Sequence, residues 1–203
     1  YQISAESLGF DYDGFKQAFT PLAEEFEMNW RLVDSNVPKK VALMASKEPH
    51  CLADLLHRWQ SKDLKCDIAC VISNHEDLRR MVEWHGIPFH YVPVKPDDKQ
   101  AAFAKVRDIV QRFGVDLVVL ARYMQIIPPD MCADYFGKII NIHHSFLPSF
   151  VGAKPYHLAY DRGVKLVGAT CHYVTEELDA GPIIEQDVVR VNHQVTREEM
   201  VRL

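Results

Sequence analysis

From Lys39 onward, short apolar runs alternate with stretches in which apolar residues recur at helical spacing. The run at 116–120 is almost purely apolar, which is typical of a strand buried on both faces of a parallel sheet. This alternation predicts an α/β fold with a doubly wound, mostly parallel sheet and right-handed crossovers. We expect strands at 41–45, 66–72, 89–92, 116–120, 138–144, 166–174 and 183–191, and helices at 50–60, 76–85, 98–113 and 129–135.

In open sheets of this kind, ligands bind outside the carboxyl ends of the strands. The residues that follow each strand are therefore the candidates for chemistry. The turn after the first strand, at 46–50, contains no glycine, and neither G-x-G-x-x-G nor G-x-x-x-x-G-K-[ST] occurs in the sequence. A nucleotide cofactor held in the usual Rossmann manner is therefore not expected.

Residues 1–36 follow a different pattern and are predicted to form a separate piece. Asp13 is a candidate cap for a helix whose apolar residues run from Phe15 to Phe26, and 28–33 alternates as a strand does. One helix and one strand cannot enclose a core, so we interpret this piece as the tail of a small α+β domain whose start is missing. The residues around 35–38 are interpreted as a linker, and the main domain is expected over 37–203.

The overall composition excludes several classes of protein. A formal net charge of -5 over 203 residues gives no basic surface of the kind that binds nucleic acid. No signal peptide opens the chain, and no run approaches the roughly 20 apolar residues that span a membrane. The five cysteines form no C-x-x-C pair, which indicates free thiols and a cytoplasmic protein.

Asn141 and His143 lie two residues apart at the end of an expected strand, so both side chains point to the same face. An amide donor can stabilise a developing oxyanion, and an imidazole can do the same or exchange a proton near neutral pH. The alternative is an asparagine at the end of a sheet beside a hydrogen-bonded core histidine. His144 points to the opposite face and is interpreted as a packed histidine.

Two loops carry further candidates. Asp179 lies between two expected strands, where a carboxylate can orient a water molecule and keep a nearby histidine protonated, or can simply form a turn. His172 ends the preceding strand and either supports Asp179 or is structural, which we favour. Gly152 precedes a helix that Pro155 is expected to start, in a loop that either closes over a substrate or only connects.

The chain contains ten histidines, so a metal site must be considered. No H-E-x-x-H, H-x-H or Cys/His cluster occurs, and adjacent histidines on a strand cannot bind one ion from one face. We therefore expect no metal.

Three segments in this order resemble the signature of the formyltransferase superfamily: 141–150 (NIHHSFLPSF), 168–174 (GATCHYV) and 178–184 (LDAGPII). The resemblance implies a Rossmann-like formyltransferase fold. It also implies that Asn141, His143 and Asp179 are the catalytic residues.

Within the superfamily, the chain is most similar to the formyltetrahydrofolate deformylases. His144 stands where glycinamide ribonucleotide formyltransferases usually carry proline, and 46–50 offers nothing like their Gly-rich phosphate loop. Deformylases carry an N-terminal ACT domain, and 1–36 resembles its second half. The segment 120–127 resembles the part of the folate pocket whose backbone meets the pterin. We expect substrate-binding residues at Arg122, Met124, Gln125, Ile126, Ile127, Gly152, His172 and Gly181.

This resemblance implies hydrolysis of 10-formyltetrahydrofolate to tetrahydrofolate and formate, which supplies formate for purine synthesis and balances one-carbon pools. It implies no cofactor, because the reduced folate is the substrate, and it implies a homo-oligomer, because ACT domains commonly pair. The alternatives are an amine formyltransferase, a non-catalytic folate sensor and a metal hydrolase built on the histidines. By this resemblance, the first half of the ACT domain and the C-terminal helix-strand end of the family are expected to be absent from these 203 residues, so regulation and assembly stay open.

Overall fold

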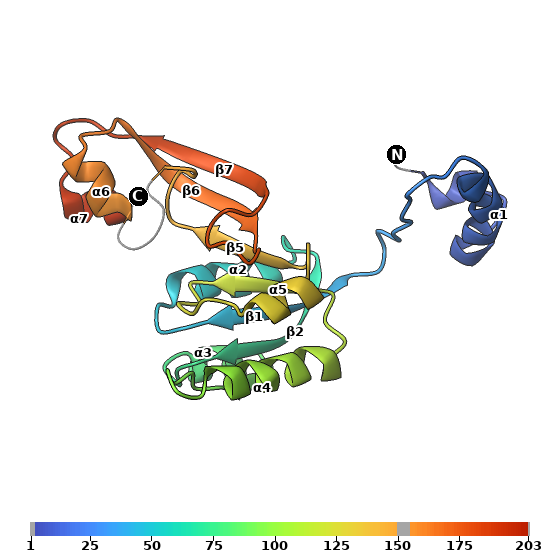
Figure 1. Ribbon diagram of the computed structural model, residues 1–203, viewed down its shortest axis with the longest axis horizontal. Coiled ribbons are helices and arrows are strands. Elements are labelled where there is room, and N and C mark those ends of the chain that lie inside the picture. The colour runs from blue at the N-terminus through green and yellow to red at the C-terminus, as the bar shows by residue number, and fades with distance from the viewer. Residues whose placement is uncertain (1–2, 150–154, 203) are drawn as a thin grey trace. The chain divides into compact units, whose positions relative to one another are not determined.

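A computed structural model describes residues 3–149 and 155–202 and divides the chain into two compact units, Tyr1–Pro38 and Lys39–Leu203 (Figure 1). The predicted boundary, between 36 and 37, lies two residues earlier.

The first unit is built on helix α1 (Tyr12–Glu25), which follows the short 3-10 helix η1 (Ala5–Ser7). The helix begins two residues earlier than predicted, because Asp11 and not Asp13 is its cap: the Asp11 carboxylate accepts a hydrogen bond from the Gly14 amide at 2.9 Å. The Phe15 and Phe19 rings stack along the helix with their centroids 5.7 Å apart.

The predicted strand at 28–33 is wrong, since these residues have no regular secondary structure. The segment instead packs along α1. The Trp30 ring meets Phe19 edge-on at 5.0 Å, and the Tyr12 hydroxyl donates to the Leu32 carbonyl at 3.1 Å. A strand needs a neighbouring strand for its backbone hydrogen bonds, and the described residues of this unit contain none. The ACT-like character of this piece therefore stays a prediction.

The second unit contains a seven-stranded sheet in the order β3-β2-β1-β4-β5-β6-β7 (Figure 1). The first five strands in this order are parallel to one another, and β6 and β7 continue the sheet as antiparallel strands. The predicted α/β fold with a mostly parallel sheet is confirmed. The strands are β1 (Lys39–Ala45), β2 (Cys66–Ser73), β3 (Phe89–Tyr91), β4 (Leu117–Ala121), β5 (Ile139–His143), β6 (Leu166–Tyr173) and β7 (Ile183–Arg190).

Helices cover both faces of the parallel part of the sheet. Alternate residues of β1 face opposite ways: Leu43 joins a core formed with α2 (His50–Gln60) and α3 (Arg79–Trp84), and Met44 joins one formed with α4 (Lys99–Arg112) and α5 (Pro129–Asp134). A third, smaller core joins α6 (Pro155–Asp161) and α7 (Arg197–Arg202) to β6. Because β1 lies between β2 and β4, the strand order reverses there, and the carboxyl ends of β1 and β4 form the switch point at which such sheets bind ligands.

Candidate active site

Asn141 and His172 face each other across the pairing of β5 with β6, where they are direct partners in the register. The two side chains are in contact, with Asn141 Nδ2 3.2 Å from His172 Nε2. The other ring nitrogen of His172, Nδ1, lies 2.9 Å from the Tyr173 carbonyl oxygen, which can only accept a hydrogen bond. In the neutral ring, Nδ1 therefore carries the proton and Nε2 accepts from the amide. This contact fixes which way the Asn141 amide points, and leaves its second N–H for another acceptor.

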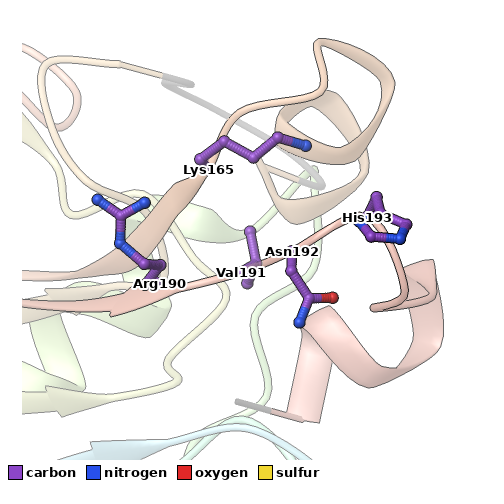
Figure 2. Close-up of a pocket in the computed structure, with 5 residues that line it drawn as sticks. All are labelled: Lys165, Arg190, Val191, Asn192 and His193. Carbon is purple, nitrogen blue, oxygen red and sulfur yellow. The ribbon is translucent and has the colours of Figure 1, made fainter.

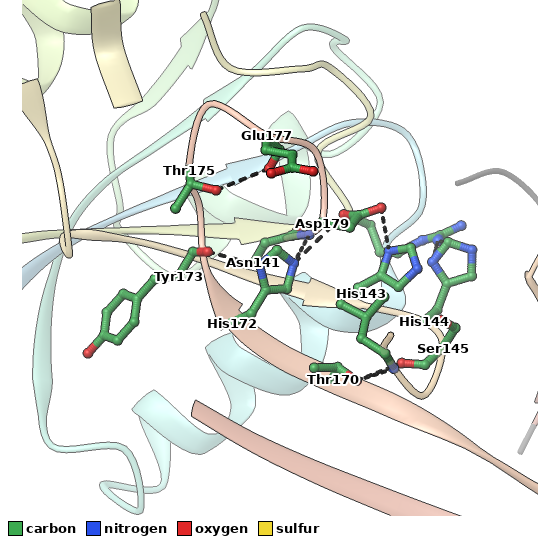
Figure 3. Close-up of polar contacts among 12 residues, drawn as sticks. Asn141, His143, His144, Ser145, Thr170, His172, Tyr173, Thr175, Glu177 and Asp179 are labelled. Carbon is green, nitrogen blue, oxygen red and sulfur yellow. Dashed lines mark hydrogen bonds and ion pairs between the residues drawn. The ribbon is translucent and has the colours of Figure 1, made fainter. Parts of the chain in front are cut away.

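Asp179 brings a buried carboxylate to the same place from the loop between β6 and β7 (Figure 3). Its side chain is only 7% exposed; Oδ2 lies 3.4 Å from His143 Nδ1, and Oδ1 lies 3.8 Å from His172 Nε2. The second distance is too long for a hydrogen bond, so the shorter contact from Asn141 governs the tautomer of His172. Asp179 is thus primarily the partner of His143.

The loop that carries Asp179 has an unusual backbone. Asp179 has a φ of +55°, in the left-handed region that aspartate tolerates better than most residues with a Cβ. Two residues later, a Cβ at Gly181 would lie 1.8 Å from the Tyr173 carbonyl oxygen. The backbone passes so close to β6 that only glycine fits at 181, and this close passage holds the carboxylate against the strand.

His143 is buried, with 6% of its surface exposed, and its two ring nitrogens are used differently. Nδ1 faces Asp179, whereas Nε2 is buried and has no hydrogen-bond partner among the described residues. Burying a polar atom without a hydrogen-bond partner costs free energy, so Nε2 is available to form a hydrogen bond with a ligand. The cluster therefore joins an amide donor, an imidazole and a carboxylate, the set of groups that stabilises a tetrahedral oxyanion and orients a water molecule.

Comparison with known proteins agrees with this geometry. The model of the Formyl transferase family matches residues 39–202. The chain belongs to the formyl transferase family. It is 50% identical over 189 residues to a formyltetrahydrofolate deformylase from Corynebacterium sp. (strain P-1), an alignment that covers 93% of this chain and 66% of that protein.

Solved structures extend the likeness to the whole described fold. A formyltetrahydrofolate deformylase from Pseudomonas syringae pv. tomato str. DC3000 superposes with a TM-score of 0.94 at 69% identity, covering 98% of this chain and 66% of that one. A phosphoribosylglycinamide formyltransferase from Anaplasma phagocytophilum superposes with a TM-score of 0.73 at 36% identity, covering 81% and 78%. The chain thus spans slightly less than two thirds of the length of the deformylases named here.

In this formyl transferase domain, the segment predicted to bind folate runs from the end of β4. Met124 and Ile126 are 59% and 57% exposed, Gln125 is half-buried, and Ile127 is only 5% exposed and belongs to the core. The Met124 amide already donates to Ser46 Oγ at 3.0 Å, so it is not free to meet a pterin as predicted. The Met124 carbonyl and the backbone of 125–127 are left for the predicted contact with a pterin.

Ser46 and Asn74 lie at the switch point and were not among the predicted residues. Both are buried, and Ser46 Oγ donates to Asn74 Oδ1 at 2.7 Å while it accepts from Met124. They directly follow β1 and β2. Their position at the carboxyl ends of two neighbouring strands is the sequence feature that could have identified them as candidates. Together they tie the Met124 segment to the switch point.

The other predicted residues have different outcomes. Gly152 lies outside the described residues. Gly181 shapes the loop, as described above, and His172 contacts Asn141 directly. Arg122 and the half-buried His144 form a pair, with Arg122 Nη1 2.8 Å from His144 Nδ1. Burial first, and then the charge of Arg122, lower the pKa of His144 from 6.5 to about 4. His144 is therefore a neutral acceptor for the guanidinium at pH 7.

A surface pocket lies elsewhere, lined by Lys165, Arg190, Val191, Asn192 and His193 (Figure 2). It adjoins the start of β6 and the end of β7, whereas the Asp179 loop joins the opposite ends of these strands. Eight residues of strand separate the two places by roughly 25 Å, so the pocket is not part of the cluster of Asn141, His143 and Asp179. Within residues 3–149 and 155–202, no three His, Cys, Asp or Glu side chains are arranged to hold a metal ion. No helix of the described ranges is long and apolar enough to cross a membrane.

Proposed function

We propose that the protein hydrolyses 10-formyltetrahydrofolate to tetrahydrofolate and formate. The observation that carries the proposal is the state of His143: Nδ1 faces the Asp179 carboxylate at 3.4 Å, and Nε2 is buried without a partner in the described chain. Similar proteins that bear the name formyltetrahydrofolate deformylase support the choice of substrate.

The chemistry follows from the three side chains. The formyl carbonyl oxygen would lie between the second N–H of Asn141 and Nε2 of a protonated His143, whose charge Asp179 stabilises. A water molecule held by Asp179 would attack the formyl carbon and give up a proton to the carboxylate. The resulting oxyanion is stabilised by Asn141 and His143. The bond from carbon to N10 then breaks as N10 takes the proton that Asp179 received from water, which releases tetrahydrofolate and formate and restores the carboxylate. None of these steps uses a metal or a redox cofactor.

The second candidate is transfer of the formyl group to an amine, which the 36% identity to a phosphoribosylglycinamide formyltransferase favours. An amine acceptor must be held close to the carbonyl, and positioning contributes roughly 7–11 kcal/mol to such reactions. The turn after β1, at 46–50, contains no glycine. A loop built to cradle an acceptor's phosphate is therefore not expected there, and water is the acceptor we favour.

The test is release of formate from 10-formyltetrahydrofolate by the full-length protein, without an amine and with a chelator present. Stoichiometric formate and tetrahydrofolate would support a metal-free hydrolase. Turnover that begins only when an amine is added would make the protein a transferase. Tight folate binding with no turnover would instead indicate a folate sensor, and loss of turnover on chelation would indicate a metal hydrolase.

We also propose that the protein works in the cytoplasm as a homo-oligomer, without nucleic-acid or membrane partners. Light scattering after size-exclusion chromatography of the full-length protein measures the assembly, and a monomer across the working concentration range would contradict this part of the proposal.

A further inference from the structure

Arg122 occupies an unusual position directly after β4, at the carboxyl edge of the sheet. Its backbone has a φ of +59°, in the left-handed region that a residue with a Cβ rarely adopts. Outliers of this kind cluster at ligand sites, where the surrounding structure holds a side chain in one direction. The direction here is toward β5, since Arg122 Nη1 lies 2.8 Å from Nδ1 and 3.3 Å from Nε2 of His144.

The charge of Arg122 is not balanced by a carboxylate. Three other half-buried arginines each form ion pairs: Arg79 with Glu76 and Glu83, Arg107 with Asp130 and Asp134, and Arg197 with Asp161. No ion pair joins Arg122 to a carboxylate in the described part of the chain, and this sets it apart, since a buried Nε without a partner is common to Arg107, Arg122 and Arg197. A partly buried charge left in this state is unfavourable, and an anion would relieve it.

In the described part of the chain, the side chains that contact Arg122 and His144 are not carboxylates, and the Asp179 carboxylate nearby is paired with His143. His144 is neutral and accepts a hydrogen bond from the guanidinium, and both of its ring nitrogens lie within 3.3 Å of Arg122 Nη1. His50 and His143 lie close enough to His144 to add to the lowering of its pKa. The Tyr156 ring packs on His144 at 5.9 Å. The site is therefore electropositive and is bounded by an aromatic ring.

This electropositive site adjoins the catalytic cluster. His144 follows His143 on the chain, and the centroids of the two rings are 5.4 Å apart (Figure 3). Guanidinium groups bind carboxylates through two parallel hydrogen bonds. We propose that Arg122 and His144 form a subsite for a small carboxylate beside the reacting centre, and that the formate released there is its occupant. This inference rests on the proposed hydrolysis. The same chemistry would recognise a glutamate carboxylate of the folate, so the test must separate the two sources.

The experiment measures formate inhibition and formate binding in the full-length protein. Initial rates of 10-formyltetrahydrofolate hydrolysis are recorded against sodium formate, with sodium chloride holding the ionic strength constant. Binding of ¹³C-labelled formate is followed separately by NMR line broadening without folate, so that it needs no turnover. In Arg122→Gln, both the inhibition constant and the dissociation constant for formate should rise about 10- to 100-fold, the effect of losing a charged hydrogen bond. Arg122→Lys should retain part of the affinity.

The matched control is Arg112→Gln, which removes the same charge from an exposed position on α4 and should leave formate affinity unchanged. Equal formate affinity in wild type and Arg122→Gln would overturn the subsite. A different pattern would assign the site to the folate: Arg122→Gln would raise KM for 10-formyltetrahydrofolate but not for 10-formyltetrahydropteroate, with formate affinity unchanged. That pattern would overturn the assignment of formate. A wild-type protein without turnover overturns the proposed function, and the binding measurement distinguishes this from failure of the subsite.

Discussion

Asp179 presents Oδ2 3.4 Å from Nδ1 of His143, and it does so from a backbone with a φ of +55°. Both side chains are 7% exposed, so the attraction between a carboxylate and an imidazolium is little screened by water. The left-handed backbone costs about 1–2 kcal/mol, which the contacts of the loop must offset. This pair is the part of the site on which the proposed reaction depends most.

Replacing Asp179 by Asn should remove turnover and spare folate binding. Asparagine has the same shape and also tolerates the left-handed region, but it cannot take a proton from water or stabilise a protonated His143. We expect kcat to fall by about 10³ to 10⁴, the range seen when a carboxylate that supports a catalytic histidine is lost. Rapid-quench turnover and fluorescence titration with folate measure the two effects. Loss of binding in Asp179→Asn would contradict the role assigned to the carboxylate.

Asn141 and His172 should act as one unit. His172→Phe keeps a ring of similar size but removes the acceptor that orients the Asn141 amide at 3.2 Å. We expect kcat to fall about 10- to 100-fold in His172→Phe, and about 10² to 10³-fold in Asn141→Ala, which removes an oxyanion donor. The double variant should be no slower than Asn141→Ala, with a coupling energy of about 1–3 kcal/mol between the residues. Additive losses would show that His172 acts independently of the amide.

Gly181→Ala should lower kcat solely because the added Cβ collides with the backbone of β6. A Cβ at 181 would lie 1.8 Å from the Tyr173 carbonyl oxygen, so the loop must shift and carry Asp179 away from His143. A displacement of about 1 Å can reduce kcat about 100-fold. Gly86→Ala is the matched control, because Gly86 has a φ of +74° but no atom near its missing Cβ. It should lower stability by about 1–2 kcal/mol while kcat stays at the wild-type value. Equal kcat values in the two variants would refute the steric argument.

His144 should make the stability of the fold depend on pH. Its pKa is lowered from 6.5 to about 4 in the folded protein, first by burial and then by Arg122, so between these values the unfolded chain binds a proton that the folded protein does not. The free energy of unfolding should therefore fall as pH decreases from 6.5 toward 4, by at most ~3 kcal/mol from this group.

Urea unfolding of wild type and His144→Gln at several pH values checks this expectation. The variant cannot titrate at 144, so its stability should decrease less steeply with acid over the same range. Parallel curves for the two proteins would mean that burial at 144 does not lower the pKa of the imidazole.

Much of the fold could be predicted from local patterns. The apolar run at 116–120 corresponds to β4, and the helical spacing at 98–113 corresponds to α4. The placement of Asn141 and His143 on one side of β5 follows from the two-residue period of a strand. The resemblance of three ordered segments then pointed to the family, which the match over residues 39–202 confirms.

Other parts of the site could not be predicted because they join distant residues. The contact of Asn141 with His172 spans 31 positions and depends on the register of β5 against β6, and that of Met124 with Ser46 spans 78. Local periodicity fixes which face of the sheet each side chain takes, but it does not identify which residue of a distant strand lies opposite. The wrong prediction of a strand at 28–33 has the same cause. Alternation shows that a segment can form a strand, but it does not show that a neighbouring strand exists to pair with it.

The sequence by itself therefore determined the alternating α/β architecture, the two side chains of β5 that share a face, and the family. Only the tertiary structure decided that His172 orients Asn141, that Asp179 approaches His143 from a left-handed backbone, and that Arg122 faces His144 without a carboxylate partner in the described chain. The physical reason is the range of the interactions. Periodicity and turn preference act over a few residues, whereas the strand register and the unbalanced charge arise only when segments 22 or more positions apart pack together. The close passage at Gly181 likewise depends on how the loop folds back against β6.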